Sequence, residues 1–354
     1  MAGLSRSERI VLVVVAVATA LAGIAHYAGW ASLLAFALAT VALAGLAHVV
    51  SFATEQVGEK FGPAVTGVMQ STLGNLPELF VVVFALHSGE TVVAQTSIIG
   101  SLFANALLVL GVVIVVGAHR ADDRCMRFKR RLPNDTATLL LVTSFIIVII
   151  GLAHAAHDPA AQHTREISTI GAIALLLVYL AWVVPYIRSD APPDAPTHGE
   201  GPRIAFGVSV VLLALAGAGA AFVSDWFVAA LRPTIDQLGV SDAFAGLVVV
   251  ALAGNAVENV AGVVLARKGE SDLAISVVKN SVAQIAAFLY PVLVLISLGF
   301  AHQLTFALNP VYIGALLLTA LAVWQITGDG EAVAFEGWAL VAIYVILAAL
   351  TLYE

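Results

Sequence analysis

The chain has 354 residues, of which 60% are hydrophobic and only 11% are charged, whereas an average soluble domain carries about 25% charged residues. The apolar residues form repeated runs of the roughly 20 residues that a helix needs to cross a bilayer, so composition excludes an ordinary soluble domain and predicts an all-α integral membrane protein. A net charge of -7 argues against a nucleic-acid partner, and the single cysteine, Cys125, excludes an internal disulfide framework.

The hydrophobic runs predict about 11 transmembrane helices. The first follows a short basic start and lacks a clear cleavage site, so we expect a retained span and not a signal peptide. Residues 188–203 are rich in proline and acidic residues, which is typical of a flexible linker. The expected spans are 10–27, 31–52, 62–86, 91–118, 136–155, 166–187, 204–230, 241–266, 272–300, 303–324 and 332–353.

The placement of basic residues predicts the orientation. If the N-terminus is cytoplasmic, Arg165 and Arg232 fall outside, Lys279 falls within a span, and the rest of the 16 Lys and Arg residues fall inside. This bias follows the positive-inside rule. We therefore expect a plasma (inner) membrane protein of a prokaryote, with the C-terminus outside.

Two segments of the chain repeat each other at an offset of 180 residues. Residues 74–90 read GNLPELFVVVFALHSGE, and residues 254–270 read GNAVENVAGVVLARKGE. Five spans separate their starting points, so the copies must cross the membrane in opposite directions. This pattern is typical of an inverted-topology transporter, with its site where the two copies meet.

Each repeated segment carries a glutamate inside the membrane. A carboxylate there is expensive and is therefore usually functional; the alternative is a protonated glutamate that only holds helices together. Gly74 and Gly254, helped by Pro77, favour breaks that free backbone carbonyls as ligands for hard cations. The candidate cation- and proton-binding residues are Glu78, Glu258, Asn75, Asn255, Gly74 and Gly254, with the two glutamates as the metal ligands.

The neighbouring spans supply neutral polar groups. We expect these groups to line the cavity, although hydrogen bonding between helices is the alternative for each of them. They are Ser97, Ser101 and Asn105 in the fourth span, and Asn280, Ser281 and Gln284 in the ninth.

Lys279 lies about two turns inside the ninth span. The cytoplasmic end of that span is near, so we expect the side chain to extend to the membrane surface. The alternative is an internal counter-charge that modulates the site.

The sequence resembles the calcium/cation antiporter superfamily, in particular its cation/proton exchanger branch. The resemblance implies one N-terminal helix (1–30), a first five-helix repeat (31–187), a cytoplasmic linker (188–203) and a second, inverted five-helix repeat (204–354). The residues that carry it are Gly74-Asn75-Leu76-Pro77-Glu78-Leu79 and Gly254-Asn255-Ala256-Val257-Glu258, with Ala53-Thr54-Glu55, Gly62, Gly67, Gly100, Ser101, Asn105, Ser281 and Gln284.

The resemblance also implies roles for individual residues. Glu78 and Glu258 would bind the cation and, alternately, protons, while Glu55 and Asp225, at the ends of the second and seventh spans, would assist or gate. The chain departs from the branch at Asn259, where histidine is typical. It departs again at Asn280, where glycine is expected, and Pro77 resembles the sodium-coupled branch.

Charge balance then predicts the activity. Two empty carboxylates carry a charge of -2, which one divalent cation or two protons neutralise, and only the neutral forms cross a low-dielectric core easily. We expect exchange of a cation, Ca²⁺ above all, for H⁺ by alternating access, with no cofactor. The lipid bilayer and the two ions are the expected partners, and a homo-oligomer stays open.

Several alternatives remain. Within the same superfamily they are exchange of Na⁺ or K⁺ for H⁺, and Na⁺/Ca²⁺ exchange; a cation channel is more remote. An enzyme is not expected, because a metal hydrolase would need histidine clusters within spans and an aspartyl protease would need two intramembrane aspartates. Asp225 is the only aspartate that lies near or within an expected span in a suitable position for such a protease.

Overall fold

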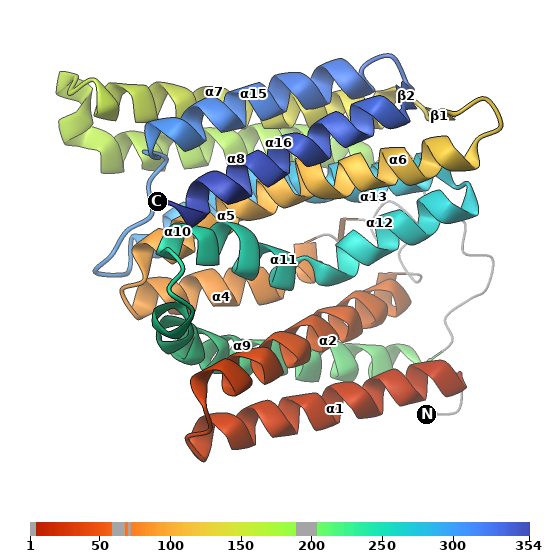
Figure 1. Ribbon diagram of the computed structural model, residues 1–354, viewed down its shortest axis with the longest axis vertical. Helices are drawn as coiled ribbons and strands as arrows, with labels where there is room; N and C mark the ends of the chain where they lie inside the picture. The colour runs from red at the N-terminus through yellow and green to blue at the C-terminus, as the bar shows by residue number, and fades with distance from the viewer. Residues whose placement is uncertain (1–4, 59–67, 70–71, 189–203) are drawn as a thin grey trace.

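The computed structural model describes residues 5–58, 68–69, 72–188 and 204–354. Within these ranges the chain is helical, apart from short connections and two three-residue strands (Figure 1). The helices are α1 (Arg6–Tyr27), α2 (Ser32–Gly58), α4 (Leu76–His87), α5 (Thr91–Phe103), η1 (Ala104–Val109), α6 (Leu110–Arg120), α7 (Arg131–Ala155), η2 (Pro159–His163), α8 (Thr164–Arg188), α9 (Phe206–Leu238), α10 (Asp242–Phe244), η3 (Ala245–Val250), α11 (Ala251–Gly254), α12 (Ala256–Lys268), α13 (Ser271–Gln284), η4 (Ile285–Leu289), α14 (Tyr290–Ser297), α15 (Pro310–Thr327) and α16 (Ala334–Leu352).

Nine helical stretches in the described part of the chain are long and apolar enough to cross a membrane. Large apolar side chains such as Val13, Phe145 and Leu318 are exposed on their outer faces. Surfaces of this kind suit hydrocarbon, where a helix satisfies its own backbone hydrogen bonds. The helical membrane architecture expected from the sequence is therefore confirmed.

The two remaining expected spans, 62–86 and 241–266, are not continuous helices in the described part of the chain. Shorter apolar helices cover Leu76–His87 and Asp242–Gly254. Residues 59–67 and 70–71 lie outside the described residues, so the first half of span 62–86 is not placed, and most of the linker 188–203 is likewise outside.

Three helices form a layer of their own. Helices α1, α2 and α9 lie side by side at one edge of the molecule, and α7, α8 and α15 lie at the opposite edge (Figure 1). Phe36 of α2 packs against Phe227 of α9, with ring centroids 4.7 Å apart. We call α1, α2 and α9 the three-helix layer, and it contacts the rest of the chain mainly through α4, α11 and α12.

The range predicted for the seventh span, 204–230, ends eight residues before the helix itself does. Helix α9 continues to Leu238 and ends at Gly239, whose φ of 65° is the left-handed conformation that glycine adopts readily. Arg232, Pro233 and Asp236 suggest a loop, but Arg232 pairs with Asp236 one turn later along the same helix, 3.5 Å away. Pairing at this spacing stabilises the extra turns.

A small β-ribbon joins two connections at one end of the bundle. Strand β1 (Cys125–Arg127) follows α6, strand β2 (Glu331–Val333) precedes α16, and the strands pair antiparallel with Met126 opposite Ala332. Only β1 lies between the fourth and fifth expected spans, and β2 lies between α15 and α16, so the ribbon joins connections from the two halves of the chain.

The order of elements recurs along the chain. Thr91 begins α5, which leads through the π-helical turn η1 into α6, and Ser271, 180 residues later, begins α13, which leads through the π-helical turn η4 into α14. Helices α4 and α12 begin at Leu76 and Ala256, again 180 residues apart. In Figure 1, α4 and α12 extend from the middle of the bundle toward opposite ends.

Candidate ion-binding site

Two helices are interrupted at the repeated Gly-Asn pairs, as the sequence predicts. Residues 72–74 are helical, Asn75 is a turn with φ -83° and ψ 3°, and α4 begins after it. Helix α11 ends at Gly254, Asn255 has φ -101° and ψ 12°, and α12 follows. Glycine and asparagine are weak helix formers, and Pro77 has no N–H to donate to the carbonyl of Leu73.

Glu78 lies in the first turn of α4 and is buried, with 5% of its surface exposed. A Cβ placed on Gly254 would lie 3.8 Å from the Cβ of Glu78. The glutamate of the first repeated segment therefore lies beside the helix break of the second. The side chain of Glu258 lies outside the described part of the structure, so its expected position opposite Glu78 stays a prediction.

Asn255 connects the two halves of the chain. Its Nδ2 donates to Ser101 Oγ at 2.8 Å and to the carbonyl of Ala251 at 3.0 Å. Its Oδ1 accepts from Asn105 Nδ2 at 3.2 Å, and Asn105 also donates to the carbonyl of Ser101 at 3.1 Å. The three side chains are at most 2% exposed. A carbonyl oxygen has two lone pairs, so Asn255 Oδ1 retains capacity for a cation.

Asn75 is placed differently. It is 5% exposed, and its Nδ2 has no hydrogen-bond partner among the described residues. It precedes α4 without capping the helix through its side chain. An amide nitrogen cannot bind a cation, whereas the oxygen of the same amide can.

Of the three polar residues expected in the fourth span, only two lie at the helix break at Asn255. Ser101 and Asn105 contact Asn255, whereas Ser97 Oγ donates to the carbonyl of Ala94 in its own helix at 3.0 Å. A close helix crossing makes the contact with Asn255 feasible, because a Cβ on Gly100 would lie 2.3 Å from the carbonyl oxygen of Leu247. A crossing this close requires glycine.

The polar residues of the ninth span lie on α13. Ser281 and Gln284 are 2% exposed, and Asn280 is half-buried. No described contact links them to Glu78 or Asn255. Their expected place in the cavity wall therefore stays a prediction.

Three π-helical turns in the described part of the chain, η1, η3 and η4, are a feature that sequence reasoning misses. Turn η1 includes Asn105, and η4 begins directly after Gln284. A π-turn inserts one extra residue into a helix and is frequent at functional sites. None of these turns has a sequence signal, because each lies in an apolar run that suits an α-helix equally well.

The expectation that Lys279 extends to the membrane surface is wrong. Lys279 is 1% exposed, and its Nζ donates to Thr327 Oγ1 on α15 at 2.8 Å. The Thr327 hydroxyl donates in turn to the carbonyl of Val323 at 2.6 Å. The ammonium is held inside by this hydroxyl acceptor, which leaves the internal counter-charge as the remaining interpretation.

Of the two expected gating acids, only one lies at a helix end. Glu55 is half-buried in the last turn of α2, which ends at Gly58. Asp225 is exposed near the middle of α9, because that helix continues to Leu238. The position expected for Asp225, at the end of its span, is therefore wrong.

Long apolar helices, with buried polar residues at two helix breaks, define an integral membrane protein. The family model described as "Sodium/calcium exchanger protein" matches residues 31–187 and 208–353. The chain therefore belongs to the sodium/calcium exchanger protein family.

Individual relatives cover almost the whole chain. It is 30% identical over 346 residues to a Ca(2+)/H(+) antiporter of Synechocystis, covering 92% of both proteins. It is 28% identical to the Ca(2+)/H(+) antiporter ChaA of Bacillus subtilis, covering 96% of this chain and 98% of that one.

Solved structures agree with the fold. The structure of native YfkE matches with a TM-score of 0.80 and 27% identity, over 97% of this chain and 100% of that chain. The H⁺/Ca²⁺ exchanger CAX matches with a TM-score of 0.75 at 16% identity, over 98% of this chain and 93% of that chain, which supports the fold alone.

Proposed function

We propose that this chain is a secondary transporter that exchanges Ca²⁺ for H⁺ by alternating access, with Glu78 and Glu258 shared by the cation and the protons. The observation that carries the proposal is the burial of Glu78 beside Gly254, at the junction of two interrupted helices. Relatives named as Ca(2+)/H(+) antiporters support the choice of ions. Glu258 enters through its place in the repeated sequence.

The two halves, 31–187 and 204–354, form inverted five-helix repeats behind an N-terminal helix, 1–30, with eleven spans in all. The recurring order of elements and the opposite directions of α4 and α12 support this arrangement (Figure 1). In an inverted repeat, equivalent helix breaks meet near the middle of the membrane and create one central site.

Charge balance couples the two ions. The empty site carries two negative charges, which Ca²⁺ or two protons cancel, and an uncompensated charge in a low-dielectric interior is costly. The loaded forms change access more readily than the empty form, which enforces exchange. Backbone carbonyls at Gly74 and Gly254, with the amide oxygens of Asn75 and Asn255, are suitable neutral ligands for Ca²⁺.

The other candidate residues surround this centre. Ser97, Ser101, Asn105, Asn280, Ser281 and Gln284 line or support the cavity, and Glu55 and Asp225 act at a distance from the ion. The protein needs no cofactor, and assembly into a homo-oligomer is compatible with this mechanism.

We also propose an orientation of the chain in the membrane. The N-terminus lies in the cytoplasm of a prokaryote and the C-terminus outside the inner membrane. Figure 1 supports opposite sides for the two ends, because α1 begins at the end of the bundle that holds β1 and β2, whereas the chain ends at the other.

Ion flux in proteoliposomes tests the function. With a pH gradient imposed, external Ca²⁺ is expected to drive proton release, and Na⁺ or K⁺ to drive little. Ca²⁺ flux that follows a Na⁺ gradient and ignores pH would replace this proposal with Na⁺/Ca²⁺ exchange. Flux of Ca²⁺ without counter-movement of protons would identify a channel.

A further inference from the structure

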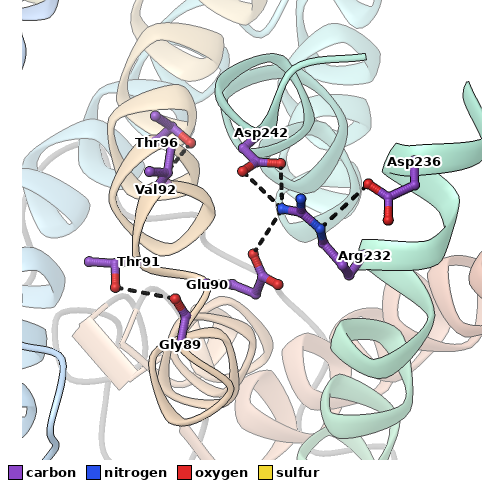
Figure 2. A network of polar contacts seen from close by, with 8 residues as sticks. All are labelled: Gly89, Glu90, Thr91, Val92, Thr96, Arg232, Asp236 and Asp242. Carbon is purple, nitrogen blue, oxygen red and sulfur yellow. Dashed lines mark hydrogen bonds and ion pairs between the residues drawn. The ribbon is translucent and has the colours of Figure 1, made fainter. Parts of the chain in front are cut away.

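Arg232 forms a network of ion pairs at the end of α9 (Figure 2). Its Nη1 donates to both carboxylate oxygens of Asp242 at 3.0 Å and lies 3.6 Å from Glu90 Oε2. Its Nε lies 3.5 Å from Asp236 Oδ1. One guanidinium thus contacts three carboxylates from different parts of the chain.

Two of these carboxylates, Glu90 and Asp242, link the three-helix layer to the helix segments that carry the candidate site. Asp236 is in α9 itself, Glu90 precedes α5 directly after α4, and Asp242 begins α10. Glu90 follows Glu78 by twelve residues, and Asp242 precedes Gly254 by twelve, which corresponds to about 18 Å of helix in each case. Arg232 therefore connects α9 to the far ends of both helix segments that meet at the site.

The ion pairs of this network are exposed to water, so each contributes little free energy and can separate readily. A cavity of about 720 Å³ is lined by Arg232, Asp236 and Asp242 together with residues of α5. The side chains of Arg232, Glu90 and Asp242 are 49%, 22% and 33% exposed. Pro233 follows Arg232 directly and removes one hydrogen bond from α9 at that point.

We propose that Arg232 is a latch that holds α9 against α5 and α10 and so keeps this end of the bundle closed. When the latch opens, the end of α9 separates from α10, the cavity between them widens, and side chains that are now largely buried on its wall, such as Ala243, become exposed to water. The inference rests on the proposed function, since alternating access requires one end of the bundle to open while the other is closed.

Reactivity of a buried thiol measures the latch without any transport. Ala243 of α10 is 6% exposed and lines the cavity, so Ala243→Cys places a reporter beside Asp242. Cys125→Ser removes the single native cysteine. The rate at which a membrane-impermeant thiol reagent modifies the reporter is measured on the full chain in nanodiscs, where both faces are accessible.

Arg232→Gln is expected to raise this rate about three- to tenfold. The rise is modest because each exposed ion pair contributes little to the stability of the closed form. Asp242→Asn removes the partner with two hydrogen bonds and should raise the rate in the same direction. Arg232→Lys keeps the charge but loses the forked guanidinium, so its rate should lie between those of the parent and Arg232→Gln.

Arg127→Gln is the matched control. Arg127 is 57% exposed and also contacts two carboxylates, Asp123 at 2.5 Å and Glu331 at 3.4 Å. Its hydrogen bond to Asp123 holds the pKa of that carboxyl below its ordinary value. These partners belong to the β-ribbon and its approach, not to the three-helix layer, so the reporter rate should not change.

Unchanged rates in both Arg232→Gln and Asp242→Asn would overturn the latch. An equal rise in Arg127→Gln would also overturn it, because general loosening would then explain the effect. The proposed function is judged separately by Ca²⁺-dependent proton release from the unmodified chain. Normal release together with unchanged reporter rates would leave the function standing and remove only the latch.

Discussion

The two helix breaks share a sequence and a backbone conformation, yet their asparagines have different surroundings. Asn255 makes hydrogen bonds to Ser101, Asn105 and the carbonyl of Ala251. Asn75 Nδ2 has no hydrogen-bond partner among the described residues. A repeated motif therefore need not repeat its contacts: Asn255 fixes the second break to α5 and η1, whereas Asn75 Nδ2 makes no such bond among the described residues.

The difference suggests that the two breaks have different roles, one mainly structural and the other mainly in binding the ion. The network around Asn255 fixes the second half to the first, and Glu78 is placed against that fixed point beside Gly254. The substitutions below separate contributions to ion exchange from contributions to folding.

Neutralising Glu78 is expected to have the largest effect. Glu78→Gln keeps the size of the side chain but removes one charge and one titratable group, so bound Ca²⁺ would leave a net positive charge in the membrane interior. Such a charge costs about 2.5–3.5 kcal/mol, which corresponds to a loss of exchange of roughly 100-fold or more. Ca²⁺-dependent proton release from proteoliposomes measures this effect.

Two further variants complete the experiment. Glu258→Gln should behave like Glu78→Gln, because the repeat places it in the same role. Glu166→Gln changes an exposed glutamate in the first turn of α8 and should leave exchange unchanged. Near-normal exchange in Glu78→Gln would mean that this carboxylate is structural.

Gly100→Ala is expected to destabilise the protein more than Gly254→Ala. A Cβ on Gly100 would lie 2.3 Å from the Leu247 carbonyl oxygen, whereas one on Gly254 would contact the Cβ of Glu78 at 3.8 Å, its nearest neighbour among the described residues. Overpacking of this kind costs about 1–3 kcal/mol, while contact at the second distance is ordinary. Thermal unfolding of the purified variants gives the ranking. Equal stability would mean that α5 and η3 can move apart without cost.

Asn255→Ala and Asn75→Ala test directly whether the two asparagines contribute differently to stability. Removing Asn255 leaves the buried polar groups of Ser101 and Asn105 short of partners, which costs about 1–3 kcal/mol. Asn75→Ala should cost less than about 1 kcal/mol, because it breaks no described hydrogen bond of Nδ2. Both variants should slow exchange without abolishing it. A reversed order of stability in chemical unfolding would contradict the comparison.

Lys279→Ile is expected to have the smallest effect. Position 99, the equivalent in the first half, is Ile99, so the substitution makes the halves more alike. Replacing this buried ammonium with an apolar residue removes the cost of desolvating a charge and loses one hydrogen bond, so the two terms should nearly cancel. Thr327→Val, which removes the hydroxyl acceptor but keeps the ammonium, should destabilise. The pair is compared by thermal unfolding, and greater destabilisation by Lys279→Ile than by Thr327→Val would show that the ammonium itself stabilises the fold.

Much of this molecule can be predicted from its sequence. Long apolar runs predict the helices, and the Gly-Asn pairs at 74–75 and 254–255 predict the breaks, because weak helix formers act locally. The repeat at an offset of 180 predicts that Glu78 approaches the second segment, and the 3.8 Å approach to Gly254 agrees.

Other features depend on contacts between distant segments and are not predictable in this way. Lys279 is buried because Thr327, 48 residues away, accepts its hydrogen bond. Past Arg232, helix α9 continues toward Asp242 and Glu90, which pair with this arginine from outside the helix and which the local sequence of α9 does not reveal. The π-turns η1 and η4 lie in apolar runs whose sequence is equally suited to α-helix.

The most direct test of the central claim, that cation and protons share the same carboxylates, is the number of protons released per Ca²⁺ bound to the purified chain. Isothermal titration calorimetry in buffers of different ionisation enthalpy measures this number across a range of pH. Shared carboxylates predict that it approaches two at low pH, where both groups are protonated, and falls toward zero as the pH rises. Calcium binding that releases no protons at any pH would contradict the account.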